Sequence, residues 1–375
     1  MIDNVFATYV IENEIYVNEE CWSDLKLKYS EEFLIQQLSD AIVYFKISLP
    51  YRKIHQTEMW DDFKALQKLD TSVLIKNGAW TTKFPYKWKN LDTYIDLSNV
   101  GAKASDYFHQ IERWKCDATG YPSPQKTWET EKFRLTLLKA IFSLKLKEIN
   151  PDKLRNCIAL RKYIASQFRP SAAKAVYDYF KAESVLDFSM GWGDRLTGAF
   201  ASNYVKRYFG FDPNKNLSIG YEKQYLKYSS IGAQLIYSYL PKCAEDKTIK
   251  IEEKFDLIFT SPPYFDKEKY DQSENQSYVK YKKFDDWMRY FLFQTIVLRT
   301  EHLKVGGHLV INISDIYTRK KHYEICDPMN DLISAIDGME YVGAIGFRMP
   351  KRPQSMSSES VGIYCEPMYV WRKIK

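Results

Sequence analysis

The tetrapeptide Ser261-Pro262-Pro263-Tyr264 holds the residue types best suited to chemistry in this chain. Two consecutive prolines lock the backbone, extend the serine before them and leave carbonyl oxygens without donors from the same segment. If the Ser261 hydroxyl and the Pro262 carbonyl each accept one hydrogen of an amine, the nitrogen becomes pyramidal and its lone pair is aimed. The ring of Tyr264 would stack on a planar base. A rigid loop without chemistry is the alternative.

Such a site suits the exocyclic amine of a nucleic-acid base. That amine is a poor nucleophile because its lone pair is delocalised into the ring, so orientation and electrostatics are the main help a protein can give it. No strong general base is needed, since an amine that takes up a methyl group becomes cationic and loses its proton readily. A base extruded from its helix could be held by the tyrosine ring.

A second segment, 185–195, has the pattern of a strand, a glycine turn and the start of a helix. Gly191 and Gly193 allow the backbone to turn tightly and to approach a ligand closely. Asp212 follows Gly193 by 19 residues, at the end of the next expected strand, where a carboxylate accepts both hydroxyls of a ribose. The combination predicts an adenosine-containing ligand, and a simple tight turn is the alternative.

Two residues favour S-adenosylmethionine over a dinucleotide as that ligand. The dinucleotide fingerprint requires a third glycine, but Leu196 stands three positions after Gly193. Asp194 opens the expected helix and would repel a phosphate there. S-adenosylmethionine carries no pyrophosphate and does not need a phosphate-binding helix start.

The elements that must position these residues follow from the texture of the chain after Ala182. Short apolar segments alternate there with helix-length segments, which is typical of a parallel sheet covered by helices. The expected strands are 184–188, 208–211, 234–237, 257–259 and 308–313, followed by an antiparallel hairpin of 341–348 and 368–371 that closes the sheet.

Residues 1–150 show a different pattern and are expected to form a mainly helical domain, followed by a catalytic domain over 151–375. Apolar residues recur at helical spacing in 31–45 and 130–146. Between them, basic and aromatic residues interleave in 83–89, which could line a nucleic-acid groove or pack on the core.

Composition limits the class of protein. The formal charge of +6 permits a polyanionic partner without requiring one, and the aromatic content of 16% suits base stacking. The chain has no apolar run long enough to span a membrane and no signal-peptide pattern at its start, so a soluble, cytoplasmic protein is expected. The six scattered cysteines show no zinc spacing, and the histidines no pairing, so no metal is predicted.

With these residues in place, the sequence resembles the S-adenosylmethionine-dependent DNA amino-methyltransferases, which act on adenine N6 or cytosine N4. Their fourth motif is Asp, Asn or Ser followed by Pro-Pro and an aromatic residue, as in 261–264. The resemblance spans about 160–375 and implies a class I, Rossmann-like domain with a seven-stranded, mostly parallel sheet and an antiparallel last strand. Asp187, Gly191 and Gly193 match the first motif and Asp212 the second.

The resemblance also implies further cofactor contacts. Segment 166–171, with Phe168 and Arg169, is similar to the tenth motif, which packs on the cofactor and helps to hold its methionine carboxylate. Glu245 and Asp246 lie in a segment similar to the third motif, which approaches the adenine of the cofactor. The motif order is that of the group with the cofactor region first.

The chain departs from that group in two ways. Its target-recognition domain normally follows the catalytic motifs, but the residues after Tyr264 suffice only to finish the sheet, so recognition is expected from the N-terminal half. Ser261 is more often associated with cytosine, which gives a slight preference for cytosine over adenine.

Further substrate contacts are expected near the tetrapeptide and between the last two strands. The candidates are Gln276 and Lys280 in the polar segment after the tetrapeptide, and Lys351 and Arg352 in the later loop, with Tyr264 as the stacking residue. A solvated loop is the alternative for each. Asn312 and Asp315, after the fifth strand, could touch substrate or cap the next segment.

A DNA base amino-methyltransferase is therefore the leading hypothesis. RNA is the nearest alternative substrate, because related enzymes share the tetrapeptide. A catalytically inactive subunit that only binds nucleic acid and a small-molecule methyltransferase remain open. The sequence does not indicate an oligomeric state.

Overall fold

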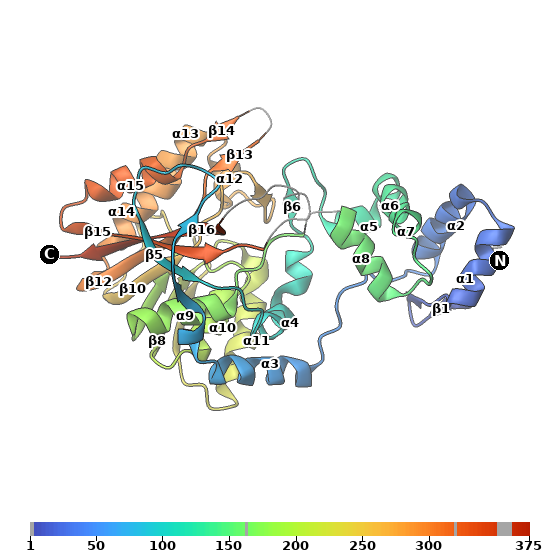
Figure 1. Cartoon of the computed structure of the whole chain (residues 1–375), viewed down its shortest axis with the longest axis horizontal. Helices are drawn as coiled ribbons and strands as arrows, with labels where there is room; N and C mark the ends of the chain where they lie inside the picture. The colour runs from blue at the N-terminus through green and yellow to red at the C-terminus, as the bar shows by residue number, and fades with distance from the viewer. Residues whose placement is uncertain (1–3, 162–163, 319–320, 351–361) are drawn as a thin grey trace. The chain divides into compact units, whose positions relative to one another are not determined.

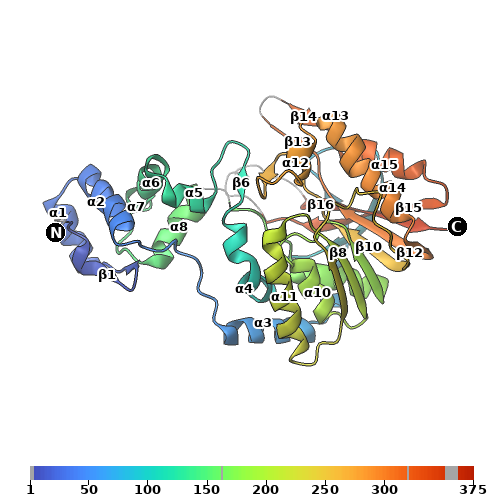
Figure 2. The ribbon, with the colours of Figure 1, turned by 180° about the vertical axis from the view of Figure 1, so that it is seen from behind.

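The computed structural model describes residues 4–161, 164–318, 321–350 and 362–375 (Figures 1 and 2). The chain divides into two compact units. We call 1–54, 110–166 and 268–271 the helical unit, and 55–109, 167–267 and 272–375 the sheet unit. This division differs from the expected boundary near residue 150, because residues 55–109 contribute strands and helices to the sheet unit. Among the described residues, no helix is both long and apolar enough to cross a membrane.

The helical unit is built around its own apolar core, which includes Trp22, Leu38 and Ile141. Its helices are α1 (Glu19–Lys28), α2 (Glu31–Tyr44), α5 (Pro124–Glu129), α6 (Glu131–Leu138), α7 (Ala140–Ser143) and α8 (Pro151–Arg161). Short pieces complete it: a 3-10 turn (Ala7–Tyr9), β1 (Val10–Ile11), β2 (Glu14–Ile15), β6 (Asp117–Ala118) and β11 (Glu268–Lys269).

The two helices predicted in this unit fare differently. Helix α2 matches the predicted 31–45, and the Ser30 side chain caps it by accepting a hydrogen bond from the Phe33 N–H at 3.3 Å. The predicted helix 130–146 is wrong as a single element, since it is split into α6 and α7. Lys139 lies between the two with φ −57° and ψ −21°, the angles of a tight 3-10 turn, which interrupts the α-helical ladder.

The sheet unit contains one large sheet with the strand order β3-β5-β15-β16-β12-β10-β7-β8-β9, and β4 also pairs with β16. Its strands are β3 (Ile75–Asn77), β4 (Trp80–Thr81), β5 (Asn90–Ile95), β7 (Ser184–Asp187), β8 (Arg207–Phe211), β9 (Ile236–Leu240), β10 (Phe255–Thr260), β12 (Leu303–Asn312), β15 (Met339–Arg348) and β16 (Ile363–Lys373). Strands β12, β10, β7, β8 and β9 are mutually parallel. The seven predicted strands are all present, and the predicted α/β fold with a mostly parallel sheet is confirmed.

The last strand is antiparallel, as predicted, but it does not close the sheet at an edge. Strand β16 lies between β12 and β15 and pairs with both. Its consecutive residues Met368, Tyr369, Val370 and Trp371 are all buried. A strand covered on both faces belongs in the interior of a sheet, which explains the position.

Three strands of the sheet come from a part of the chain expected to be mainly helical. Strand β5 runs parallel to β15, with Ile95 opposite Phe347, and β3 pairs antiparallel with β5. The Trp80 indole of β4 donates a hydrogen bond to the Leu91 carbonyl at 2.8 Å. These short segments extend the sheet beyond the seven strands that the sequence predicted.

Helices cover both faces of the sheet (Figure 1). On one side lie α3 (Gln56–Lys68), α9 (Pro170–Phe180), α10 (Asp194–Ala201), α11 (Ser218–Ser229) and the first part of α4 (Ala102–Arg113). On the other lie a π-helix (Trp287–Phe293), α14 (Gln294–Thr300) and α15 (Cys326–Ser334). Alternate residues of β10 serve the two layers, because Ile258 joins the core with Trp287, whereas Phe259 contacts Tyr177 of α9.

Short elements connect these layers. They are two 3-10 turns (Thr71–Val73 and Lys215–Leu217), α12 (Ser277–Lys280), α13 (Phe284–Asp286) and the hairpin of β13 (Ile316–Tyr317) and β14 (His322–Tyr323).

The turn between β7 and α10 is shaped by residues of α4 and α11. Gly193 has φ +70° and precedes α10. A Cβ atom at this position would lie 2.5 Å from Gln224 Oε1 and 2.6 Å from His109 Nε2, and both side chains are buried. Gly191 has φ +60°, but its Cβ would meet only the Ser189 carbonyl oxygen, at 3.9 Å. Steric exclusion by the protein itself therefore requires a glycine at 193.

Gly193→Ala and Gly191→Ala should separate this steric effect from backbone strain. Both alanines would be held at positive φ, which costs about 1 kcal/mol, so Gly191→Ala serves as the matched control. We expect Gly193→Ala to lower the free energy of unfolding by about 2 kcal/mol more, because overpacking of the His109 and Gln224 side chains is added. Equal losses for the two variants in urea unfolding would contradict this interpretation.

Candidate active site

The glycine turn and the proline tetrapeptide leave neighbouring strands at the same edge of the sheet. Strands β7 and β10 are adjacent and parallel, with Leu186 opposite Ile258. The segment after β7 contains both glycines, and the tetrapeptide follows the end of β10 at Thr260. The carboxyl ends of parallel strands are where ligands bind in open α/β sheets. The glycine turn and the tetrapeptide therefore follow the carboxyl ends of two adjacent parallel strands.

A buried ion pair holds the glycine turn. Asp187 is fully buried, and its Oδ2 accepts hydrogen bonds from Arg195 Nε at 2.7 Å and the Tyr208 hydroxyl at 2.6 Å. Its Oδ1 accepts from Arg195 Nη2 at 3.3 Å and from the Ser189 N–H at 3.1 Å. Burial opposes the charge of Arg195, but Asp187 raises the pKa of the guanidinium overall. Asp187, predicted to bind cofactor, thus uses both of its oxygens within the protein.

Asp212 lies beside the same turn. Its Oδ2 accepts a hydrogen bond from the Gly191 N–H at 2.8 Å, and its Oδ1 accepts from the Asn214 N–H at 2.9 Å. Each carboxylate oxygen can accept a further hydrogen bond. Burial raises the pKa of Asp212 to about 6, although the two backbone donors act in the opposite direction. The carboxylate therefore titrates close to neutral pH.

The segment before α9 packs against the start of α10. Gln167 Nε2 donates a hydrogen bond to Asp194 Oδ1 at 2.8 Å, and the Arg195 guanidinium lies 5.4 Å from the centre of the Phe168 ring. Phe168 also stacks on Phe347, with ring centres 5.1 Å apart. The contacts of Gln167 with Asp194 and of Phe168 with Arg195 keep segment 167–169 next to the glycine turn.

Arg169 is a half-buried cation with no hydrogen-bond or ion-pair partner among the described residues. Burial lowers the pKa of its guanidinium. A desolvated arginine without a partner is costly unless a ligand anion pairs with it, and a carboxylate suits it best because the contact can be bidentate. This side chain is the strongest candidate for holding an acidic group of a cofactor.

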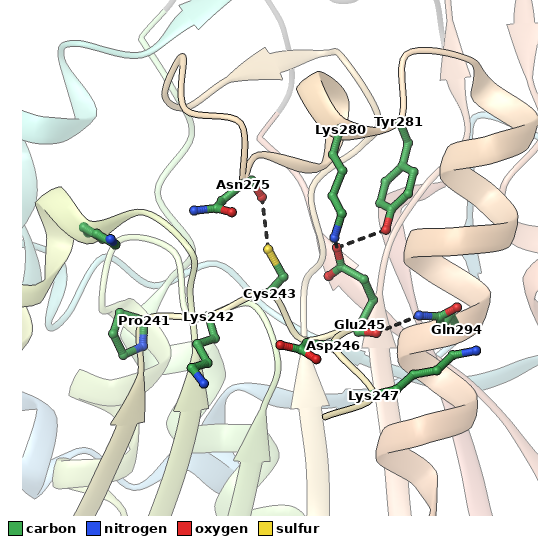
Figure 3. A pocket seen from close by; sticks show the side chains of 11 residues that line it. Pro241, Lys242, Cys243, Glu245, Asp246, Lys247, Asn275, Lys280, Tyr281 and Gln294 are labelled. Carbon is green, nitrogen blue, oxygen red and sulfur yellow. Dashed lines mark hydrogen bonds and ion pairs between the residues drawn. The ribbon is translucent and has the colours of Figure 1, made fainter. Parts of the chain in front are cut away.

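Glu245 and Asp246 lie in the loop after β9, beside a cavity of about 470 Å³ (Figure 3). The buried Glu245 carboxylate accepts hydrogen bonds from Lys280 Nζ at 2.9 Å and from the Tyr281 hydroxyl at 3.3 Å. Asp246 Oδ1 accepts from the Thr248 N–H at 2.8 Å and hydroxyl at 2.7 Å. The cavity is lined by 241–247 and by the segment after the tetrapeptide, and the tetrapeptide itself does not line it.

Asn312 and Pro367 fix the serine of the tetrapeptide. The Ser261 hydroxyl lies 3.5 Å from Asn312 Oδ1, and Asn312 Nδ2 donates to the Pro367 carbonyl at 3.2 Å. Because Asn312 uses its amino group on Pro367, only its oxygen faces Ser261, so the serine donates to Asn312 and its own oxygen retains acceptor capacity. Among the described residues, no donor contacts the Pro262 carbonyl.

The turn that ends the tetrapeptide is strained and held by packing. Phe265 has φ +48°, an unusual value for a residue with a large side chain. Its buried ring contacts Phe284 at 5.5 Å, Trp287 at 5.8 Å and Tyr323 at 5.7 Å between ring centres. Strain that persists under such packing is common where a backbone must be held in a functional shape.

Tyr264 is half-buried beside charged groups of both signs. Burial raises the pKa of its hydroxyl well above the usual value, the Glu366 carboxylate adds to the effect, and a hydrogen bond with Ser261 opposes it. The Lys267 ammonium lies 4.9 Å from the centre of the ring, within cation–π distance. The hydroxyl therefore stays protonated, and a base that stacks on the ring must share it with Lys267 or displace the ammonium.

The other predicted substrate contacts are placed less uniformly. Gln276 is buried at the start of α12. Burial opposes the charge of Lys280, but its hydrogen bond to Glu245 raises the pKa of the ammonium overall. Lys351 and Arg352 lie outside the described residues. Among the residues that the structure describes, no cluster of His, Cys, Asp and Glu could hold a metal ion.

Four residues near the tetrapeptide or the turn were not singled out by their sequence context, namely His109, Arg195, Lys267 and Glu366. Asn312 was considered, but capping was the preferred role. Only Arg195 and Lys267 are close in sequence to a predicted motif, and a charged residue within a few positions of a functional turn is the signal that could have found them.

Comparisons with known proteins bear on the C-terminal part of the chain. A family model described as DNA methylase matches residues 255–375. No match was found among curated proteins.

Solved structures of low similarity were also found. The chain is similar to the N-methyltransferase NodS from Bradyrhizobium japonicum WM9 (12% identity over 52% of this chain and 87% of that chain, TM-score 0.34). It is also similar to an rRNA methylase from Streptococcus thermophilus (14%, 56% and 100%, TM-score 0.33) and to TrmN from Thermus thermophilus (15%, 60% and 53%, TM-score 0.35). At these TM-scores the similarity assigns neither substrate nor activity to this chain.

The family match covers the tetrapeptide, the strand before it, β10, and the three long strands after it, β12, β15 and β16. It supports methyltransferase activity and agrees with the resemblance seen in the sequence. Over residues 255–375, therefore, the chain is similar to the DNA methylase family, and methyltransferase activity is the function that this match supports.

Proposed function

We propose that this protein transfers a methyl group from S-adenosylmethionine to the exocyclic amine of a base in DNA, at cytosine N4 or adenine N6. The observation that carries the proposal is the position of the glycine turn and the tetrapeptide on the adjacent parallel strands β7 and β10. The serine at position 261 gives cytosine a slight preference. We assign target recognition to the helical unit.

The residues at the glycine turn fit S-adenosylmethionine, which supplies a methyl group on a positively charged sulfur. Arg169 offers an unpaired cation for a carboxylate, and Asp212 offers two oxygens with remaining acceptor capacity for ribose hydroxyls. A Cβ at Gly191 would meet nothing closer than 3.9 Å, so space remains beside that turn. Asp194 is buried at the start of α10, where a phosphate would be repelled.

The tetrapeptide would orient the target amine. Asn312 Oδ1 accepts the hydrogen bond from the Ser261 hydroxyl, so Ser261 Oγ and the Pro262 carbonyl oxygen can each accept one amine hydrogen. The nitrogen lone pair then points away from both acceptors, which reduces its delocalisation into the base. Preorganised acceptors of this kind need no rearrangement during the reaction, which is why they contribute effectively.

Tyr264 would hold the extruded base, and solvent would take the proton. Its ring is available for stacking once Lys267 shifts towards a phosphate, which offsets part of the unstacking cost of a few kcal/mol. The raised pKa of Tyr264 keeps its hydroxyl neutral, so it does not act as a base. The methylated amine is acidic enough to lose its proton to water.

The activity can be tested by incubating the full-length protein with methyl-labelled S-adenosylmethionine and unmethylated DNA. Digestion to nucleosides and mass spectrometry should reveal labelled N4-methylcytosine or N6-methyladenine. Pro263→Ala and Tyr264→Ala should reduce turnover at least 100-fold, because orientation of the amine is lost, while donor binding persists. A parallel incubation with RNA completes the test, and label in RNA alone, or in no nucleic acid despite donor binding, would refute the proposal.

Asn312→Asp and Asn312→Ala test the orientation of Ser261. Asn312→Ala removes the oxygen that accepts from Ser261, so the serine proton is no longer directed away from the target amine, whereas Asn312→Asp keeps an acceptor and loses only the amide that donates to Pro367. For Asn312→Ala we expect kcat to fall about 10- to 100-fold with little change in the KM for either substrate, as for loss of an oriented polar group, and for Asn312→Asp we expect a smaller loss. Asn330→Ala is the control, because this buried asparagine donates to the Cys326 carbonyl instead. A similar loss of kcat in Asn312→Ala and Asn330→Ala would point to structural damage.

Asp212 makes donor binding depend on pH. With its pKa near 6, the carboxyl is protonated below that pH and can no longer accept from two hydroxyls. Affinity for S-adenosylmethionine should be constant above about pH 7 and should fall by up to about tenfold per pH unit below 6, as for one titrating group. Asp212→Asn should bind weakly with no such slope. Calorimetric titrations between pH 5 and pH 8 that gave a flat wild-type profile would exclude this role.

A further inference from the structure

A cluster of aromatic and basic side chains lies beside the tetrapeptide and has no part in the reaction described so far. It combines Lys83 and Phe84 with Tyr317, Lys321 and His322 of the β13–β14 hairpin, and we call these five residues the aromatic platform. Phe84 stacks on His322 with ring centres 5.0 Å apart and an interplanar angle of 14°. Tyr317 lies 6.4 Å from Phe84 and 6.1 Å from His322, so three rings form one group.

Four residues of the platform are exposed, and Phe84 is half-buried. Tyr317 is 60% exposed, and Lys83 and Lys321 are exposed as well. Within the same segment, Trp88 packs on Trp371 at 5.1 Å, and the Tyr86 hydroxyl lies 3.1 Å from Ser314 Oγ. Segment 83–89 therefore serves two purposes, since its second half packs on the sheet and its first half remains on the surface.

Two contacts place the platform next to the catalytic edge. The hairpin follows β12, whose last residue Asn312 contacts Ser261. Tyr323, the partner of Ile316 in the hairpin, packs on Phe265, the residue directly after the tetrapeptide. The hairpin that carries Tyr317 and His322 is therefore packed against the residue that follows the tetrapeptide.

The hairpin is held rigidly by Asp315. Its Oδ1 accepts hydrogen bonds from the Ile325 and Cys326 N–H groups, both at 2.9 Å, and its Oδ2 lies 2.9 Å from His322 Nε2. The imidazole is thus fixed against Phe84. A stacking surface that is ordered in advance loses little conformational freedom when a ligand binds.

The charges on the platform suit a polyanion. Lys83 Nζ lies 5.3 Å from the Phe84 ring centre and 5.4 Å from that of Tyr317, and Lys321 Nζ lies 4.6 Å from the Tyr323 ring. Asp315 faces His322 and the backbone, and Glu324 is the other acid near the imidazole, at 3.9 Å. Rings for bases next to ammonium groups for phosphates are the usual composition of a single-strand contact.

We propose that the aromatic platform binds an unpaired nucleotide of the DNA strand beside the target base. The inference rests on the proposed function, because it takes the strand to enter at the tetrapeptide. Extrusion of one base leaves its neighbours partly unstacked, and the rings of Tyr317 and Phe84 can replace the lost stacking. Lys83 and Lys321 then contact the flanking phosphates.

The test is binding of a fluorescent 20-nucleotide single-stranded DNA, followed by anisotropy at several salt concentrations, to the full-length protein. Lys83→Ala/Tyr317→Ala should weaken binding about tenfold or more through the lost stacking. The salt dependence should also become shallower by about 0.7 in log–log slope for the phosphate contact removed. Affinity for S-adenosylmethionine should not change.

Tyr179→Ala/Lys206→Ala is the matched control. It also removes one exposed tyrosine and one exposed lysine. Tyr179 is 46% exposed and lies near the end of α9, and the Lys206 side chain is 71% exposed and lies just before β8, so both are at the opposite end of the parallel strands. Equal binding by both double variants, or no binding by the wild type, would overturn the inference. Methyl transfer is measured separately. If the platform variant loses DNA binding but the wild type never methylates DNA, only the proposed function is refuted. If the wild type methylates DNA and the platform variant binds DNA as tightly as the wild type, only the inference about the platform is refuted.

Discussion

The buried pair of Asp187 and Arg195 is the interaction on which the rest of the candidate site depends. It joins the end of β7 to α10, and through Tyr208 it also reaches β8. Removing either partner would leave an unpaired charge in the interior, at a cost of about 3–5 kcal/mol. The same guanidinium lies over Phe168, so the segment carrying Arg169 is held in place by the pair that shapes the glycine turn.

The sheet could be predicted from the sequence because its central strands are short, mostly apolar segments between helix-length stretches. β10, for example, is buried along almost its whole length. Strands β4 and β5 join the sheet through pairings between residues more than 200 positions apart, such as Ile95 with Phe347, which no local pattern reveals. The interior position of β16 depends on its pairing with β12, as between Val310 and Val370, and β3 joins the sheet only through β5. The split at Lys139 was missed for the opposite reason, since a single residue with 3-10 angles leaves the apolar period intact.

The candidate site shows the same contrast between local and distant signals. The tetrapeptide could be recognised because consecutive prolines restrict the backbone on their own, whatever surrounds them. The reason for the glycine at 193 could not be recognised, because a ligand was expected where the side chains of His109 and Gln224 in fact leave no room for a Cβ atom. Asn312 illustrates the difficulty best, since its role depends on the Pro367 carbonyl, which occupies its amino group and turns its oxygen towards Ser261.

The buried carboxylate of Glu245 connects the loop after β9 with the segment after the tetrapeptide. Its loop follows β9, and its partners Lys280 and Tyr281 belong to the segment after the tetrapeptide. Gln294 and Arg299 hold the backbone of that loop from α14, with hydrogen bonds of 2.7 and 2.8 Å to the Glu245 and Ala244 carbonyls. Because Glu245 is 3% exposed, its charge is stabilised only while Lys280 remains in place, so the segment that would hold the target strand is tied to the edge expected to contact the cofactor.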